Sequence, residues 1–530
     1  MFTCRQNSLQ SDVFDLARRL NLPFSRREIA VRLFAACWLV YLLHFATNTV
    51  REIYPALSLG DHLSFDVSEY LGFHPDIFEI PGRGAFINNN PGASILGAIP
   101  YALTRPVIDR IVEKVQESRV AAADERAEYN SIYPMAREFY RKARQRGLDV
   151  KFGLAAAVMQ ALLMAPLSAL SAVVMVYILG SLTSARAALF LSLLYAFATP
   201  VFYRTAQLNQ NLLVSHFAFF AFALLWQPWG KQARPQNMRY FIAGLLAGWT
   251  VVLDYSGLVV VSSLALYVCL AHAGAIARRK IFQNLCVYGA GAGLAMAVLL
   301  AYQWVSFGNP FYPAQYYMPA ATFTDLGYRG MDWPKLDLLW ATGFSLRFGL
   351  FTSAPLLLLT LYPAGWFRNC RILATPELIF VVTFSVLFFL FCAANQYGRM
   401  QFNSGVRHIV PVTPFLFLIA AGVLLRFPTG LAVAVGIIGT YWSWCLAMYR
   451  DVEQGWGVLE SVSHITTEGP RLPWLSTLKS MGYLADATPP FLLILATAAV
   501  LCALWMFGRS RDAMPLTHIQ NVNSSYGKDG

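Results

Sequence analysis

Residues 29–52 read IAVRLFAACWLVYLLHFATNTVRE, a long apolar block followed at once by an arginine and a glutamate. A helix needs about 20 apolar residues to cross the roughly 30 Å hydrocarbon core of a bilayer, and lipid offers no partner to an open backbone. The block therefore predicts a membrane-spanning helix. Arg26 and Arg27 precede it and no small-residue cleavage site follows, so we expect an uncleaved span with a cytoplasmic N-terminus.

Similar apolar blocks recur along the chain. Of its 530 residues, 57% are apolar and only 13% are charged, whereas soluble domains carry about 25% charged residues, so a soluble globular protein is excluded. The sequence predicts an all-α polytopic membrane protein with about twelve transmembrane helices. We place the predicted spans at 29–47, 152–180, 185–204, 209–228, 239–254, 256–273, 281–306, 345–365, 376–394, 408–425, 430–448 and 488–507.

The charges between the blocks predict the orientation. Short connections on one side carry Arg186, Arg239, Arg278 and Arg426, as the positive-inside rule requires of cytoplasmic loops. The longer polar segments fall on the opposite side, and we expect both termini to be cytoplasmic in a plasma (inner) membrane. The predicted parts are a cytoplasmic segment 1–28, a transmembrane domain 29–507 with extracytoplasmic loop 48–151, and a cytoplasmic tail 508–530.

Charge and cysteine content exclude two further classes. The formal net charge is +12, but the Lys and Arg residues are spread between the spans, so we expect membrane lipids and no nucleic acid as partners. None of the eight cysteines lies in the large outer loop. Neither a disulfide framework nor a cysteine metal site is therefore predicted.

The outer loop 48–151 divides into three parts by composition. Residues 48–90 are rich in Gly, Pro, Asn and acids and predict a loop with short helical pieces. Residues 91–103 are apolar but too short to span, which favours a helix lying on the membrane. From Pro106 to Gly147 the pattern is that of a charged helix.

Acids concentrate at the start of this loop. In a loop of this size most of them are expected to form a solvated surface. Glu52 differs, because it lies within one helical turn of the membrane boundary, where a carboxylate could act as general base on an acceptor hydroxyl. Asp66 is the second candidate for this role, and Glu69 follows.

A second group of candidates precedes the tenth predicted span. Arg399, Arg407 and His408 are expected at the outer membrane boundary. They could be anchors that reach the lipid headgroups. Alternatively they form a cationic clamp on a lipid-linked phosphate, for which arginine suits because its fork pairs with two phosphate oxygens.

Three stretches carry a family resemblance. After the charged pair at 51–52 come GDHLSFDVSEY (60–70), INNNPGASILGAIP (87–100) and, near the end, NSGVRHIVPVTPFL (403–416). In this order the chain resembles bacterial GT-C glycosyltransferases of glycosyltransferase family 39, the dolichyl-phosphate-mannose protein mannosyltransferase-like group that includes the lipid A aminoarabinose transferases. The likeness covers most of the chain.

The resemblance implies a catalytic acid just past the first span, where Glu52 lies. It also implies an Asp and a Lys before the Pro-Gly pair, where this chain has Asn88 and Asn89. Asparagine still hydrogen-bonds phosphate or sugar hydroxyls but brings no charge. Asn89 is therefore the fourth donor-phosphate candidate, after the two arginines and His408.

The sequence thus predicts an inverting glycosyltransferase that moves a sugar from a polyprenyl phosphate to an acceptor glycan, lipid or protein on the extracytoplasmic face. The sequence also allows a divalent metal ion shared between carboxylate and phosphate, although no ligand spacing demands one. The alternatives are a twelve-helix secondary transporter and a non-catalytic GT-C relative. The nearly charge-free spans speak against the transporter, and the two asparagines favour the non-catalytic relative.

Overall fold

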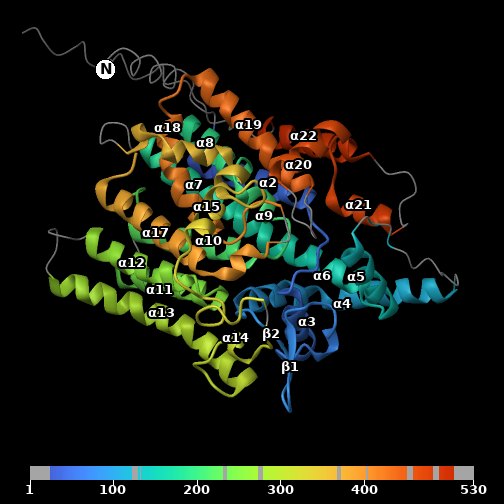
Figure 1. The fold of residues 1–530 in the computed structure, drawn as a ribbon. Helices are drawn as coiled ribbons and strands as arrows, with labels where there is room; N and C mark the ends of the chain where they lie inside the picture. The colour runs from blue at the N-terminus through green and yellow to red at the C-terminus, as the bar shows by residue number, and fades with distance from the viewer. Residues whose placement is uncertain are drawn as a thin grey trace, which may run out of the picture.

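The computed structural model describes residues 24–121, 129, 131, 133–230, 236–271, 278–320, 322–366, 372–401, 404–449, 457–481 and 489–506. Within these ranges the helices are joined by turns and loops, and the two named strands, Ile77–Ile80 (β1) and Gly84–Ile87 (β2), form one unpredicted hairpin (Figure 1). The helical class is therefore confirmed. Most of the predicted segment 1–28 and all of the tail 508–530 lie outside the described residues.

Four of the described helices are long and apolar enough to cross a membrane: Asp149–Leu182, Arg278–Phe307 (α13), Thr375–Ala394 (α17) and Thr429–Met448 (α19). The first joins α6 (Asp149–Met159) and α7 (Ala165–Leu182) through a π-helical turn. These helices support the membrane class, whereas the number twelve and the orientation stay predictions. The shorter apolar helices are α8 (Ala185–Phe197), α10 (Gln210–Trp226), α12 (Gly257–Ala271), α18 (Thr413–Leu424) and α22 (Pro490–Met506).

The remaining helices complete the assembly. Figure 1 places α3, β1, β2 and α14 together at one end of the helical bundle. The bounds are α2 (Arg26–Leu43), α3 (Ile53–His62), α4 (Gly92–Ala121), α5 (Pro134–Gln145), α9 (Pro200–Arg204), α11 (Gln236–Leu253), α14 (Ala314–Tyr317), α15 (Leu336–Phe344), α16 (Leu350–Ser353), α20 (Val458–Glu468) and α21 (Pro473–Ser480).

The predicted span 345–365 is wrong as a single helix. Only α16 is α-helical there, and 3₁₀ turns follow at Pro355–Leu361 and Pro363–Gly365. Proline lacks the N–H that continues an α-helix, so Pro355 and Pro363 each restart the chain in a new turn. Hydropathy alone does not detect such breaks.

Helices α11 and α13 pack at close range, side by side in Figure 1. Gly244 and Gly248 of α11 face the backbone of α13, where an added Cβ would lie 1.9 Å from the Tyr288 oxygen and 2.4 Å from the Ala292 oxygen. Only glycine fits at these two positions. Small residues four apart are the usual means by which helices approach in lipid, where no hydrophobic force draws them together.

Helix α4 corrects the division predicted for the outer loop. The segments 91–103 and 106–147 were expected to be separate, but a single helix runs from Gly92 to Ala121 through Pro100 and Pro106. Its exposed face carries apolar side chains four residues apart, which suits a helix at the membrane boundary. These residues are Ile99, Leu103, Val107 and Ile111.

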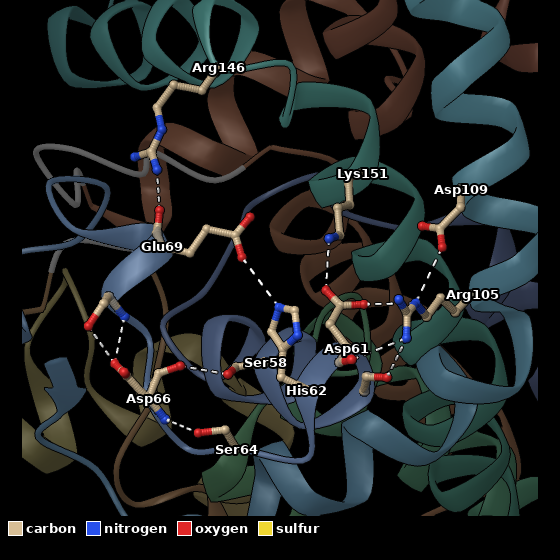
Figure 2. A network of polar contacts seen from close by, with 12 residues as sticks. Ser58, Asp61, His62, Ser64, Asp66, Glu69, Arg105, Asp109, Arg146 and Lys151 are labelled. Atoms are coloured by element: carbon tan, nitrogen blue, oxygen red, sulfur yellow. Dashed lines mark hydrogen bonds and ion pairs between the residues drawn. The ribbon is translucent and has the colours of Figure 1, made fainter. Parts of the chain in front are cut away.

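A buried carboxylate joins α3 to α4 and α6. Asp61, near the end of α3, pairs with Lys151 of α6 at 2.8 Å and with Arg105 of α4 at 3.1 Å (Figure 2). The Tyr101 hydroxyl donates to the same carboxylate at 2.9 Å. Three helices thus depend on one charged group, and losing it would leave a partly buried cation without its partner.

We therefore expect Asp61→Asn to lower the free energy of unfolding by about 3 kcal/mol. The measurement is thermal unfolding of the purified protein in detergent. Asp109→Asn is the matched control, because Asp109 pairs with the same arginine at 3.3 Å but is exposed, and such pairs contribute about 0–1 kcal/mol. Equal melting temperatures for the two variants would contradict the account.

Candidate functional site

A polar cluster lies directly after the first helix and is centred on Arg51. Its Nη1 donates to Asp76 Oδ2 at 2.8 Å and to Asn88 Oδ1 at 3.2 Å, while its Nε lies 3.4 Å from Glu52 Oε1. The hairpin brings two of these partners together. Because Ile77 pairs with Ile87, the flanking Asp76 and Asn88 lie opposite each other, and the Asn88 N–H donates to the Asp76 carbonyl at 3.3 Å.

Glu52 occupies the turn where α3 begins. The residue is 4% exposed, and its carbonyl accepts a 2.7 Å hydrogen bond from Ser94 Oγ in the first turn of α4. Its backbone is therefore fixed between two helix N-termini. Its carboxylate forms a longer ion pair with Arg51 than Asp76 does, so the tighter pair holds Asp76 and leaves Glu52 less engaged.

A turn from the C-terminal half of the chain joins this cluster. Arg204, which ends α9 and is 1% exposed, donates to the carbonyls of Val406 at 2.6 Å and Gly405 at 2.7 Å. Gly405 has φ +85 and packs against the Tyr203 ring, a conformation and a space that suit glycine. These hydrogen bonds fix the backbone of the turn immediately before Arg407.

Arg407 lies within electrostatic range of the Arg51 cluster. Burial lowers the pKa of Arg407 to about 10, with Arg51 and Arg204 acting in the same direction and Glu52 and Asp76 opposing them. Arg407 stays protonated at neutral pH. The charges within electrostatic range of one another are thus three guanidinium groups and two carboxylates, and this excess of positive charge favours an anionic ligand.

The pKa values of Asp76 and His74 are both lowered, which favours the charged form of the carboxyl group and the neutral form of the imidazole. Burial raises the pKa of Asp76, but Arg51, His74 and Arg407 outweigh it and hold that pKa below 3.8. Burial lowers the pKa of His74 from 6.5, helped by Arg51 and Arg407. At neutral pH Asp76 is therefore ionised and His74 is neutral, and His74 Nδ1 accepts the Asp76 N–H at 3.1 Å.

The structure places the other two predicted bases apart from this cluster. Asp66 Oδ1 accepts hydrogen bonds from Ser68 N, Ser68 Oγ and Ala85 N at 2.9, 2.5 and 3.0 Å, and so fixes the loop against β2 (Figure 2). Glu69 is exposed, and its carboxylate lies 3.9 Å from His62 Nε2. Asp66 therefore takes part in the hydrogen bonds that hold the loop, whereas Glu69 lies on the loop surface.

The predicted phosphate ligands also separate. Arg399 forms a 2.6 Å ion pair with exposed Asp337 and donates to Gln396 Oε1 at 3.2 Å, so its partners lie outside the Arg51 cluster. His408 follows Arg407 and lies within electrostatic range of Arg407, Arg51 and Arg204. Asn89 follows Asn88, which hydrogen-bonds Arg51, and is 4% exposed.

Sequence reasoning gave too little weight to three residues. Arg51, His74 and Arg204 are not among the residues that the sequence predicts for the site. A signal existed for Arg204, because an arginine between two apolar blocks and beside the polar run QLNQN (207–211) is costly unless it is paired.

Within the described ranges, no three His, Cys, Asp or Glu side chains gather as ligands for a metal ion. A divalent ion at Glu52 or Asp76 would need ligands from a bound phosphate. In comparisons with known proteins, no family model, curated protein or solved structure matches the chain. Function is therefore argued from the geometry of the site.

The depressed pKa of Asp76 predicts a pH-dependent stability. A carboxylate whose folded pKa lies below 3.8 stabilises the fold above that value and loses this effect as the pH falls through the folded pKa. Asp76→Asn should therefore unfold at a lower temperature than the unmutated protein at about pH 6, and the difference should shrink toward about pH 3. Glu79→Gln, on the exposed edge of the hairpin, is the control. A difference that does not change with pH would contradict a charged Asp76.

Proposed function

We propose that this chain is a GT-C-type glycosyltransferase that moves a sugar from a polyprenyl phosphate to an acceptor hydroxyl on the extracytoplasmic face of the plasma (inner) membrane. In this proposal the helices form about twelve spans with both termini cytoplasmic. The cluster then lies at the outer membrane boundary, where a lipid-linked donor presents its phosphate.

One observation carries the proposal: a buried carboxylate and an excess of guanidinium groups converge from distant parts of the chain. Glu52 follows the first helix and Arg407 precedes α18, yet Glu52 lies within electrostatic range of Arg407 and opposes the lowering of the Arg407 pKa. Glycosyl transfer from a phosphate needs a base for the incoming hydroxyl and positive charge for the departing phosphate. Both groups are present here.

The reaction follows from these two roles. The Glu52 carboxylate takes the proton of the acceptor hydroxyl while that oxygen attacks the anomeric carbon. The bond from the anomeric carbon to the phosphate oxygen breaks, and its electron pair leaves with the polyprenyl phosphate. Arg407 stabilises the charge that develops on this oxygen. Attack opposite the leaving group inverts the anomeric configuration.

The remaining residues of the cluster have supporting roles in this proposal. Arg51 holds Asp76 and Asn88, and so keeps the hairpin against the start of α3. Arg204 holds the turn that carries Arg407. Arg407 and His408 are the phosphate contacts, and Arg399 has none of these functions because its partner lies elsewhere.

Replacing the base should stop transfer without abolishing donor binding. Glu52→Gln keeps the shape of the side chain but removes its ability to take a proton, so kcat should fall by roughly 10²–10⁴-fold. Glu69→Gln is the matched control and should retain activity, because Glu69 is exposed and outside the cluster. Transfer is measured with a radiolabelled polyprenyl-phosphate sugar in proteoliposomes.

Asp66→Asn separates stability from chemistry in the same assay. Because Asp66 holds its own loop, this variant should unfold at a lower temperature while its folded fraction keeps the turnover of the unmutated protein. Loss of turnover in Asp66→Asn together with full activity of Glu52→Gln would assign the base to Asp66. Solute transport by proteoliposomes without any glycosyl transfer would instead support the transporter.

The two arginines should also behave differently. Arg407→Ala removes charge-assisted hydrogen bonds and should weaken donor binding by roughly 10- to 100-fold, with Arg407→Lys restoring part of it. Arg399→Ala should leave donor affinity unchanged, because Arg399 pairs with Asp337. The dissociation constant of a short-chain polyprenyl phosphate reports both effects. Equal affinities for all three variants would argue against a phosphate at Arg407.

A further inference from the structure

Asn89 is a buried amide with an unused donor and an unused acceptor. The residue is 4% exposed, and neither its Nδ2 nor its Oδ1 has a hydrogen-bond partner among the described residues. Leaving such groups unpaired costs about 1–3 kcal/mol each, so a native structure needs a reason for them. The neighbouring Asn88 binds Arg51, which places Asn89 beside the proposed site.

Two glutamines also have a buried side-chain carbonyl oxygen without a hydrogen-bond partner in the described part of the chain. Gln315 Nε2 of α14 donates to the Asn88 carbonyl at 2.6 Å, and its Oε1 is buried without a partner in the described part of the chain. Gln210 Nε2 donates to Asp254 Oδ2 at 3.1 Å, and its Oε1 is likewise unpaired. In each case the bonded nitrogen fixes which end of the amide is the free oxygen.

Contacts of the intervening backbone connect Gln210 to Asn89. Asn90 Nδ2 donates to the Val251 carbonyl at 2.8 Å, near the end of α11. Asp254, the partner of Gln210, follows the same helix end. An added Cβ at Gly92 would lie 2.7 Å from the Val252 carbonyl, so the start of α4 and the end of α11 are in direct contact.

The chemistry of this amide set does not fit a phosphate. Phosphate and carboxylate oxygens only accept hydrogen bonds, so they would face the glutamine oxygens lone pair to lone pair. A hydroxyl or an amino group donates to such oxygens, and a hydroxyl also accepts from Asn89 Nδ2. Two adjacent hydroxyls of a sugar ring therefore satisfy groups that an anion leaves unpaired.

We infer that Asn89, Gln210 and Gln315 form the subsite for the transferred sugar, and that this subsite selects a sugar with hydroxyl or amino groups over one with a carboxylate. The inference rests on the proposed function. It moves Asn89 from the phosphate, where the sequence placed it, to the sugar, and leaves the phosphate to Arg407 and His408.

The test uses three probes with the purified full-length protein: farnesyl phosphate, farnesyl-phosphoryl glucose and farnesyl-phosphoryl glucuronic acid. The unmutated protein should bind the glucose probe more tightly than the glucuronic acid probe. Asn89→Ala should weaken the binding of the glucose probe by roughly 3- to 10-fold and leave the binding of farnesyl phosphate unchanged. Unchanged binding of farnesyl phosphate also shows that the variant is folded.

The matched control is Asn309→Ala, since Asn309 caps the backbone of Phe311 outside the cluster, and all three affinities should be retained. An equal loss for farnesyl phosphate and the glucose probe in Asn89→Ala would overturn the sugar subsite and leave the proposed function standing. Tighter binding of the glucuronic acid probe by the unmutated protein would also overturn it. If none of the probes binds, the proposed function fails, and the inference fails with it.

Discussion

The candidate site depends on one buried guanidinium. Arg204 donates to the carbonyls of Gly405 and Val406, while the Gly405 N–H donates to the Arg347 carbonyl and the Val406 N–H to Ser353 Oγ. A turn among apolar helices must satisfy its backbone groups internally, and these four bonds do so. The fixed turn precedes Arg407, which lies within electrostatic range of Arg51, Glu52 and Asp76, so groups from both halves of the chain contribute charge to one region.

Much of the helical framework could be predicted from the sequence, because the length of an apolar run determines whether a helix can cross a bilayer. The failures have local causes. Pro355 and Pro363 break the predicted span 345–365 into 3₁₀ turns, whereas Pro100 and Pro106 are tolerated inside α4. The same residue type thus gives opposite results, so the presence of a proline in an apolar run does not by itself predict where a helix ends.

The site was predictable only in part, for a similar reason. Position beside the first span singled out Glu52, and the structure places it in the buried cluster. Nothing in the sequence distinguished Arg407 from Arg399, since both were expected at the same boundary. Their separation depends on the long-range partners Arg204 and Asp337. Asp66 likewise accepts hydrogen bonds from Ser68 Oγ and from the N–H of Ala85, and Ala85 belongs to the unpredicted hairpin.

The central claim is that Glu52 and Arg407 lie on opposite sides of one bound donor. An experimental structure of the protein with a short-chain polyprenyl-phosphate sugar tests it most directly. The account predicts phosphate density within hydrogen-bond distance of the Arg407 guanidinium, with the anomeric carbon facing the Glu52 carboxylate. Phosphate density at the Arg399–Asp337 pair, with no ligand between Glu52 and Arg407, would contradict it.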